Sequence, residues 1–283
     1  MSAPSTGAGA APVDLTVAFS SLAERVPQIR PPRHPGVRVV VHVQGPTQDL
    51  EVPEGVDRVV PVPGRGVARS RNAAIEECRT RYLLFCDDDV DVDLDGVLAA
   101  VDHLRVTGAA IALGRAVDPD GHLRKRYRTD RPTPLSLLNS AKAATYEMLV
   151  DVAQVRQAGV RFDERFGAGA ETYLGDEYLF IAELLSAGLR GYAVPFVFGV
   201  HPRTSSGSRW GGRDLHVRAV VINHAFGRAA PVARLVFGWR NRRSIGDRRR
   251  LAQFAADGST LHGQVPRRRG AARAIDPPGP PPA

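Results

Sequence analysis

The chain has 283 residues, of which 43% are hydrophobic and 24% are charged, so it can bury the core of one large domain or of a domain with an appendage. It lacks a run of about eighteen apolar residues that would span a bilayer, and its first residues lack the basic start and apolar stretch of a cleaved signal. We therefore expect a cytoplasmic protein, with Cys78 and Cys86 as reduced thiols. The net charge of +8 favours anionic partners.

The first half of the chain alternates short apolar runs with segments of helical spacing. The apolar runs are rich in β-branched residues, which favours buried strands. Gly108 and the turn sequence DPDG mark the ends of two elements. The predicted strands are residues 14–19, 37–43, 57–62, 81–86 and 109–117, and the predicted helices are 68–80 and 94–108.

The second half continues this alternation and then changes. We predict a strand at 145–152, a helix at 175–188 and a strand at 190–200, followed by a basic helical segment at 216–256 that Pro231 interrupts. Strands alternating with helices indicate an α/β fold, with a mostly parallel sheet covered on both faces. The sequence MSAPSTGAGAAPV at 1–13 and the Arg- and Pro-rich segment 263–283 are too poor in large apolar residues to pack, so we expect disordered tails.

Five aspartates follow one predicted strand in RYLLFCDDDVDVD, residues 81–93. Side chains alternate along a strand, so Asp87 and Asp89 point the same way and Asp88 points the opposite way. Ligands of open α/β sheets bind beyond the carboxyl ends of the strands, and Mg²⁺ or Mn²⁺ is commonly held there by one or two carboxylates and a phosphate. The alternative is an acidic loop that caps the helix beginning near Asp95. A calcium loop fits less well, because the bidentate Glu beyond its Gly is missing.

Four segments in this order resemble the family 2 glycosyltransferases of the GT-A fold: GRGVARSRNAAI, YLLFCDDDV, VRFDERFGAGAETYLGDEYLFIAELLSAG and GVHPRTSSG. In that family a Gly/Ala-Arg-Asn segment opens a helix, a DxD-type triplet ends a strand, and a Gly-Glu-Asp segment opens a later helix. The resemblance covers roughly residues 15–207. It implies a GT-A-like, Rossmann-like domain at 14–210, followed by a basic helical appendage at 211–262.

The resemblance also implies roles for individual residues. Asp87 would contact the ribose of the donor nucleotide, and Asp89 would bind a divalent metal, Mn²⁺ or Mg²⁺, at the diphosphate, with Asp87 as a second ligand of that metal. His201 matches a position that can supply a further metal ligand, although a lone His before Pro is more often an ordinary loop residue. The other donor-site residues implied by the resemblance are Ser20, Arg69, Arg71, Asn72 and Asp88.

The sequence departs from the family at the position of the expected catalytic base. Where the family usually has Glu-Asp after Gly, this chain has Asp176 and Glu177 after Gly175. The resemblance then assigns the base to Glu177, with Asp176 as the alternative. Acidic residues also stabilise the first turn of a helix without any catalytic role, and that structural explanation stays open here.

The reaction implied by the resemblance is an inverting transfer of a sugar from a nucleotide-sugar donor to an acceptor hydroxyl. The acceptor could be a glycan, a lipid-linked glycan or a small molecule. One alternative is a nucleotidyltransferase, but the sequence AFSSLAERV after the first strand lacks the expected Gly-rich loop. Another is an inactive GT-A-like module whose basic surface binds other molecules.

The basic C-terminal segment allows two interpretations. Its apolar residues can pack on the catalytic domain, or the segment can lie on an anionic membrane at the inner face, where each basic residue contributes roughly 1 kcal/mol. We expect no nucleic-acid partner.

Overall fold

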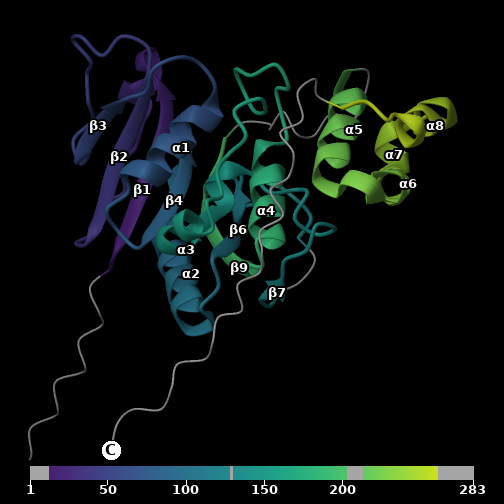
Figure 1. Ribbon diagram of the computed structural model, residues 1–283. Coiled ribbons are helices and arrows are strands. Elements are labelled where there is room, and N and C mark those ends of the chain that lie inside the picture. The colour runs from purple at the N-terminus through teal and green to yellow at the C-terminus, as the bar shows by residue number, and fades with distance from the viewer. Residues whose placement is uncertain (1–12, 128–129, 203–212, 261–283) are drawn as a thin grey trace, which may run out of the picture.

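The computed structural model describes residues 13–127, 130–202 and 213–260. A sheet covered by helices on both faces is followed by a group of C-terminal helices beside α4 (Figure 1). The strands are β1 (Leu15–Leu22), β2 (Val37–Gln44), β3 (Arg58–Pro61), β4 (Tyr82–Asp87), β5 (Asp91–Val92), β6 (Ile111–Val117), β7 (Thr133–Pro134), β8 (Met148–Asp151) and β9 (Gly191–Val200). The α-helices are α1 (Val67–Glu77), α2 (Leu94–Thr107), α3 (Val152–Gln157), α4 (Asp176–Ser186), α5 (Arg213–Phe226), α6 (Ala230–Arg240), α7 (Arg242–Ile245) and α8 (Arg248–Ala256). Short 3-10 helices of the described ranges are η1 (Ala23–Gln28), η2 (Thr145–Glu147) and η4 (Gly227–Ala229).

These elements confirm the predicted α/β class with a mostly parallel sheet. The strand order is β3-β2-β1-β4-β8-β6-β9-β5, with β7 also paired to β9. The strands β1 to β4 are parallel to one another, and β6 and β9 run in the same direction because β8 is antiparallel to both β4 and β6. The sequence predicted the strand β8 but not its reversed direction. The predicted tails lie outside the described residues, apart from Val13.

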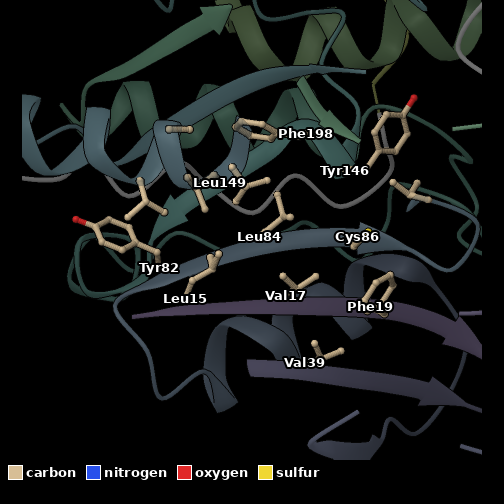
Figure 2. Packing of buried hydrophobic residues seen from close by; sticks show 14 of the residues in the cluster. Leu15, Val17, Phe19, Val39, Tyr82, Leu84, Cys86, Tyr146, Leu149 and Phe198 are labelled. Carbon is tan, nitrogen blue, oxygen red and sulfur yellow. The ribbon is translucent and has the colours of Figure 1, made fainter. Parts of the chain in front are cut away.

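Each face of the sheet has its own hydrophobic core. Alternate residues of β1, β2 and β4 pack against α2 and η1 on one face, where Phe19, Leu84 and Cys86 are buried (Figure 2). The residues between them, such as Leu83 and Phe85 of β4, pack against α1, α3 and α4 on the other face. Strand alternation therefore explains why the runs in this sequence are continuously apolar, since a sheet covered on both faces buries every residue.

The C-terminal helices form a third apolar cluster with the outer side of α4. Tyr178, Leu179 and Ala182 of α4 pack with residues of α5, α6 and α8, among them Val221 and Phe237. The break that the sequence predicted at Pro231 falls between α5 and α6, where proline occupies the first turn of the new helix. Within the described residues, no helix combines the length and the apolar character needed to cross a bilayer.

Gly175 explains how α4 can begin so close to α5. Its φ is +100°, which side chains other than glycine rarely adopt, and a Cβ there would lie 2.4 Å from a methyl of Val221. The helix starts immediately after this residue, so Asp176 and Glu177 occupy its first turn. The glycine thereby fixes where the acidic pair lies relative to the sheet.

Candidate active site

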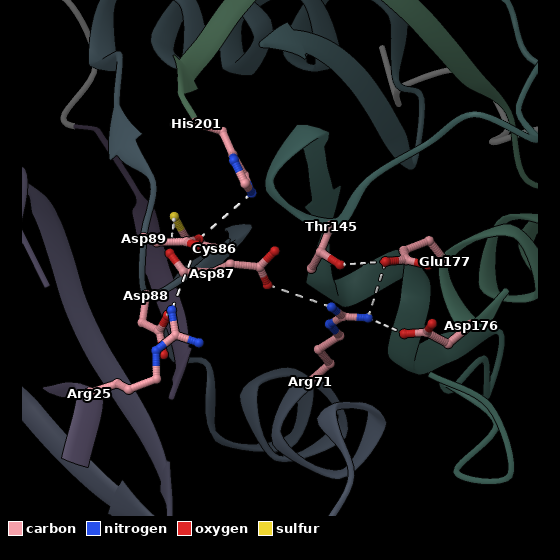
Figure 3. A network of polar contacts seen from close by, with 10 residues as sticks. All are labelled: Arg25, Arg71, Cys86, Asp87, Asp88, Asp89, Thr145, Asp176, Glu177 and His201. Atoms are coloured by element: carbon pink, nitrogen blue, oxygen red, sulfur yellow. Dashed lines mark hydrogen bonds and ion pairs between the residues drawn. The ribbon is translucent and has the colours of Figure 1, made fainter. Parts of the chain in front are cut away.

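The predicted acidic triplet lies at the carboxyl end of β4, next to the end of β1 (Figure 3). Asp87 is the last residue of the strand, and it pairs in register with Ser20 of β1. Asp88 turns toward η1, where its carboxylate lies 2.6 Å from Arg25 and accepts a hydrogen bond of 2.9 Å from Ser21. Arg25 also approaches Asp89, whereas Asp87 faces Arg71, so the predicted shared direction of Asp87 and Asp89 is wrong: β4 ends at Asp87, and strand alternation does not extend beyond it.

Asp89 faces His201, which follows β9. The distance from Nε2 of His201 to Oδ1 of Asp89 is 3.7 Å, and Arg25 lies 3.6 Å from the other carboxylate oxygen. The ring of His201 packs against the ring of Tyr146 with 4.8 Å between centroids, and Arg124 donates a hydrogen bond of 2.6 Å to the His201 carbonyl. The structure thus brings together two of the predicted metal ligands from segments more than a hundred residues apart.

Arg71 lies at the centre of the site and connects three carboxylates (Figure 3). It extends from α1 and is almost fully buried; its guanidinium donates a hydrogen bond to Asp176 and lies 3.6 Å from Glu177 and 3.6 Å from Asp87. Burial opposes its charge, but the attraction of these three carboxylates outweighs burial and raises the pKa of Arg71. The guanidinium therefore stays charged and links the end of β4 to the start of α4.

The two acids at the start of α4 differ in environment. The Asp176 side chain is 3% exposed, whereas that of Glu177 is 23% exposed and accepts a hydrogen bond of 2.9 Å from the hydroxyl of Thr145. Burial and the neighbouring Glu177 charge raise the pKa of Asp176. Burial also acts on Glu177, but Arg71 and the hydrogen bonds from Asp176 and Thr145 outweigh it and lower its pKa. At neutral pH the pair therefore keeps its negative charge on Glu177.

Asp87 is the second unusual acid of the site. Burial raises its pKa to about 6, with Arg71 opposing the shift and with Glu177, Asp89 and Asp88 adding to it by charge repulsion. A cation placed among these carboxylates would stabilise the ionised form of Asp87, because it would offset the repulsion between their charges.

The chemistry of the donor set fits a divalent cation at Asp89 and His201. Carboxylate oxygen is the preferred ligand of Mg²⁺ and Mn²⁺, and imidazole is tolerated by Mn²⁺. Asp87 is turned toward Arg71, so the three predicted ligands do not form a closed cluster. Across the described ranges, the only group of three ligand atoms within 4.8 Å of one another is Asp118, Asp120 and His122. That group sits in the DPDG turn, where Asp118 accepts hydrogen bonds from the backbone of the other two residues, so turn formation accounts for it.

Two further implied donor-site residues, Arg69 and Asn72, also have protein partners. Arg69 forms an ion pair of 2.9 Å with Glu164 while remaining half exposed. Both ends of the Asn72 amide bind the backbone of Phe162, at 3.0 Å and 2.8 Å, which fixes α1 against the segment before α4. Their contact with a donor stays a prediction.

Arg25, Thr145 and Arg124 each contact a predicted site residue, but none of them was among the site residues that the sequence predicted. Arg25 is separated from Asp88 by 62 intervening residues, and nothing in either local pattern indicates the pairing. A cavity of about 320 Å³ lies elsewhere, near the amino ends of β1 and β2, and is lined by Thr16, His42, Arg58 and other residues. The strand-end carboxylates do not line it.

Comparison with known proteins gave a family match and a set of similar folds. Residues 56–163 match the model of the family described as "Glycosyl transferase family 2". This segment contains α1 and the acidic triplet and ends before Asp176. No curated protein sequence matched the chain.

The similar solved structures cover most of the chain. Residues 1–349 of S. aureus TarS match with a TM-score of 0.54 and 14% identity, covering 87% of this chain and 70% of that one. The same protein in complex with UDP gives a TM-score of 0.55 at 15% identity, covering 84% and 73%. A structure described as a mycobacterial protein gives 0.51 at 18% identity, covering 76% and 74%. At these identities the similarity establishes the shared fold.

The matched segment makes residues 56–163 similar to a family of glycosyltransferases. That family is family 2, and the chain shares the fold of the solved structures described above, in agreement with the order of its motifs.

Proposed function

We propose that the chain is an inverting glycosyltransferase that moves a sugar from a nucleoside-diphosphate sugar to an acceptor hydroxyl. The observation that carries this proposal is the Arg71 network, because it sets an ionised, partly exposed Glu177 opposite the carboxylates at the end of β4. A base on one side and a cation-binding end of a strand on the other suit direct displacement at the anomeric carbon, with no covalent sugar intermediate.

Glu177 is the proposed base. Its lowered pKa keeps it ionised at neutral pH, so it can accept the proton of the acceptor hydroxyl as that oxygen attacks the sugar. Thr145 and Arg71 hold the carboxylate in place from two directions. Asp176 is buried behind it, where its raised pKa makes it a hydrogen-bonding partner of Glu177.

The donor is proposed to bind at the ends of β1 and β4. Asp87 and Ser20 lie side by side there, beside Asp88, and Arg69 and Asn72 belong to the helix that faces them. Asp89 and His201 are the residues that would hold Mn²⁺ or Mg²⁺. Such a cation, when bound, neutralises charge on the diphosphate leaving group.

UDP-sugars are the first donors to test. TarS structures with UDP and with UDP-GlcNAc are among the similar folds, and this chain aligns with the UDP-GlcNAc complex at 14% identity and a TM-score of 0.51. The proposed acceptor is a glycan, a lipid-linked glycan or a small molecule.

Thermal unfolding with nucleotides tests the donor site. A ligand at about a hundred times its Kd adds about 2.7 kcal/mol of stability, which raises the Tm of a domain of this size by about 5 to 10 °C. We expect UDP with Mn²⁺ to give a shift of this size in the wild type. Asp89→Asn is expected to lose the metal-dependent part and the transferase activity while its own Tm stays near that of the wild type.

Asp118→Asn is the matched control, because it removes one carboxylate from the other acidic cluster. It should keep the full nucleotide shift. If Asp118→Asn loses the shift and Asp89→Asn retains it, the metal assignment is wrong. If neither UDP, GDP nor dTDP shifts the Tm with either metal, the proposed donor class is wrong.

A further inference from the structure

Helix α6 carries apolar residues on two opposite faces. Its inner face packs against α5 and α8 through Ala230, Ala233, Phe237 and Gly238. A second set of apolar residues recurs at intervals of three, four and seven positions, which places the set on one side of a helix. We call this set the α6 outer face; its members and their exposed fractions are Val232 (65%), Leu235 (60%), Val236 (37%) and Trp239 (65%).

The exposed apolar residues are concentrated at this face. Nine large hydrophobic residues are exposed among the described residues, and four of them belong to the outer face of this one helix. A fifth, Leu138, is 45% exposed, and its carbonyl accepts a hydrogen bond of 3.0 Å from Arg240 at the end of α6. Isolated exposed apolar residues need no explanation, whereas a contiguous stripe marks a surface that contacts something apolar.

Arginines surround this stripe with little opposing charge. From Gly227 to Arg250 the sequence contains eight arginines and one acid, Asp247; of these arginines, Arg234 is buried on the inner side of α6, where it binds Asn223. Asp247 is occupied as the N-cap of α8, where it accepts a hydrogen bond of 2.8 Å from the backbone of Arg249. The guanidinium of Arg242 lies 4.3 Å from the Trp239 ring centroid. Arg240 and Arg243 are exposed near Trp239 in the sequence, and Arg228 is exposed just before α6.

We propose that the α6 outer face docks on an anionic lipid bilayer, with α6 lying in the plane of the interface. An apolar stripe that contains a tryptophan enters the boundary between headgroups and acyl chains, while flanking arginines meet anionic headgroups. This inference goes beyond the proposed glycosyl transfer and does not depend on it.

Charge complementarity favours a membrane at this face over the segment 261–283 or a second copy of the chain. The remainder of this chain, residues 261–283, carries four arginines against one aspartate, so it has the same sign as the arginines around α6. A second copy meeting the first through the same face would oppose one set of arginines with another. An anionic bilayer supplies both the apolar phase and the negative charge.

Vesicle flotation tests this proposal directly. The full chain, without donor or acceptor, is mixed with vesicles of phosphatidylglycerol and phosphatidylcholine, or of phosphatidylcholine alone, at low and high salt. We expect binding to the anionic vesicles at low salt, loss of most of it at high salt, and little binding to phosphatidylcholine alone. In a Trp210→Phe background the Trp239 emission should shift to shorter wavelength on binding.

Two double variants separate the contribution of the arginines to vesicle binding from that of the apolar stripe. Arg242→Gln with Arg243→Gln should lower the partition coefficient by about 30-fold, since each basic residue near the surface is worth roughly fivefold. Leu235→Ser with Trp239→Ser should lower it by about tenfold or more. All four side chains are exposed, so both variants should keep the wild-type Tm.

The control variants make changes of the same kind elsewhere on the surface. Val106→Ser alters an apolar side chain that is 87% exposed on α2, and Arg38→Gln with Arg79→Gln removes two exposed charges near the amino ends of the strands. These controls should bind vesicles like the wild type. The proposal is overturned if the wild type does not float with anionic vesicles at low salt, or if the α6 variants bind as well as the controls. It is also overturned if the face instead forms a dimer, or is covered by a polynucleotide that prevents vesicle binding.

Discussion

Exchanging each member of the acidic pair for its amide tests which residue is the base. Glu177→Gln removes the charge of the exposed member, and loss of a general base lowers turnover by about 10² to 10⁴. We expect at least a hundredfold loss of kcat with the donor KM changed by less than about threefold. The amide oxygen can still accept the hydrogen bond from Thr145, so the cost in unfolding free energy is about 1 kcal/mol or less.

Asp176→Asn provides the comparison. Because the pKa of Asp176 is raised, an asparagine resembles the protonated acid already present at neutral pH, and we expect turnover within about tenfold of the wild type. The assay is steady-state release of nucleoside diphosphate from the best donor, with Tm measured for each variant. If Asp176→Asn lost more turnover than Glu177→Gln, the assignment of the base would be reversed. Equal loss of donor affinity in Glu177→Gln would place that residue in the donor site.

Three further predictions concern stability. Burial, and after it the charge of Arg58, lower the pKa of His42 to about 4. The contribution of neutral His42 to the free energy of unfolding is therefore complete above pH 6.5 and falls by about 3 kcal/mol between pH 6.5 and 4. Urea unfolding of His42→Leu should lack this part of the pH dependence. Gly96→Ala should lower the free energy of unfolding in urea by about 3 kcal/mol, because the new Cβ would lie 1.7 Å from the Val197 carbonyl oxygen and push α2 away from β9. An unchanged urea midpoint would contradict this packing. Arg156→Gln should lower the free energy of unfolding by about 1 to 2 kcal/mol, since the guanidinium of Arg156 donates hydrogen bonds to three carbonyls at the end of α1. A loss below about 0.3 kcal/mol would mean that water satisfies these carbonyls as well as the guanidinium does.

The sequence predicted those features of the fold that depend on local pattern. Continuous apolar runs predicted buried strands, Gly108 predicted the end of α2, and the predicted helix at 175–188 ends within two residues of the end of α4. The aspartates after β4 were predicted to lie at the ligand-binding edge because the carboxyl ends of parallel strands share one edge of a sheet. The direction of β8 was not predicted, since the side-chain pattern of a strand buried on both faces is the same in either orientation.

The connections within the site depend on tertiary structure. The motif implied that Arg71 faces the donor, but its contact with Asp176 and Glu177 joins residues that are more than a hundred positions apart. The swapped order of the acidic pair left the choice of base open, and only the burial of Asp176 and the exposure of Glu177 distinguish them. Arg25 reaches Asp88 through the turn geometry of η1, which no periodicity indicates.

The two-sided core gives this chain a natural pair of unfolding reporters. Cys86 is buried on the face of the sheet covered by α2, and Cys78 is buried on the face covered by α1. Burial raises the pKa of the Cys86 thiol, so this thiol reacts with alkylating reagents only after local or global opening. The alkylation rates of the two thiols, followed separately by mass spectrometry in the native state, therefore measure whether the two layers of helices open together or independently. Equal rates under conditions where opening limits the reaction would mean that the sheet and both layers form one cooperative unit.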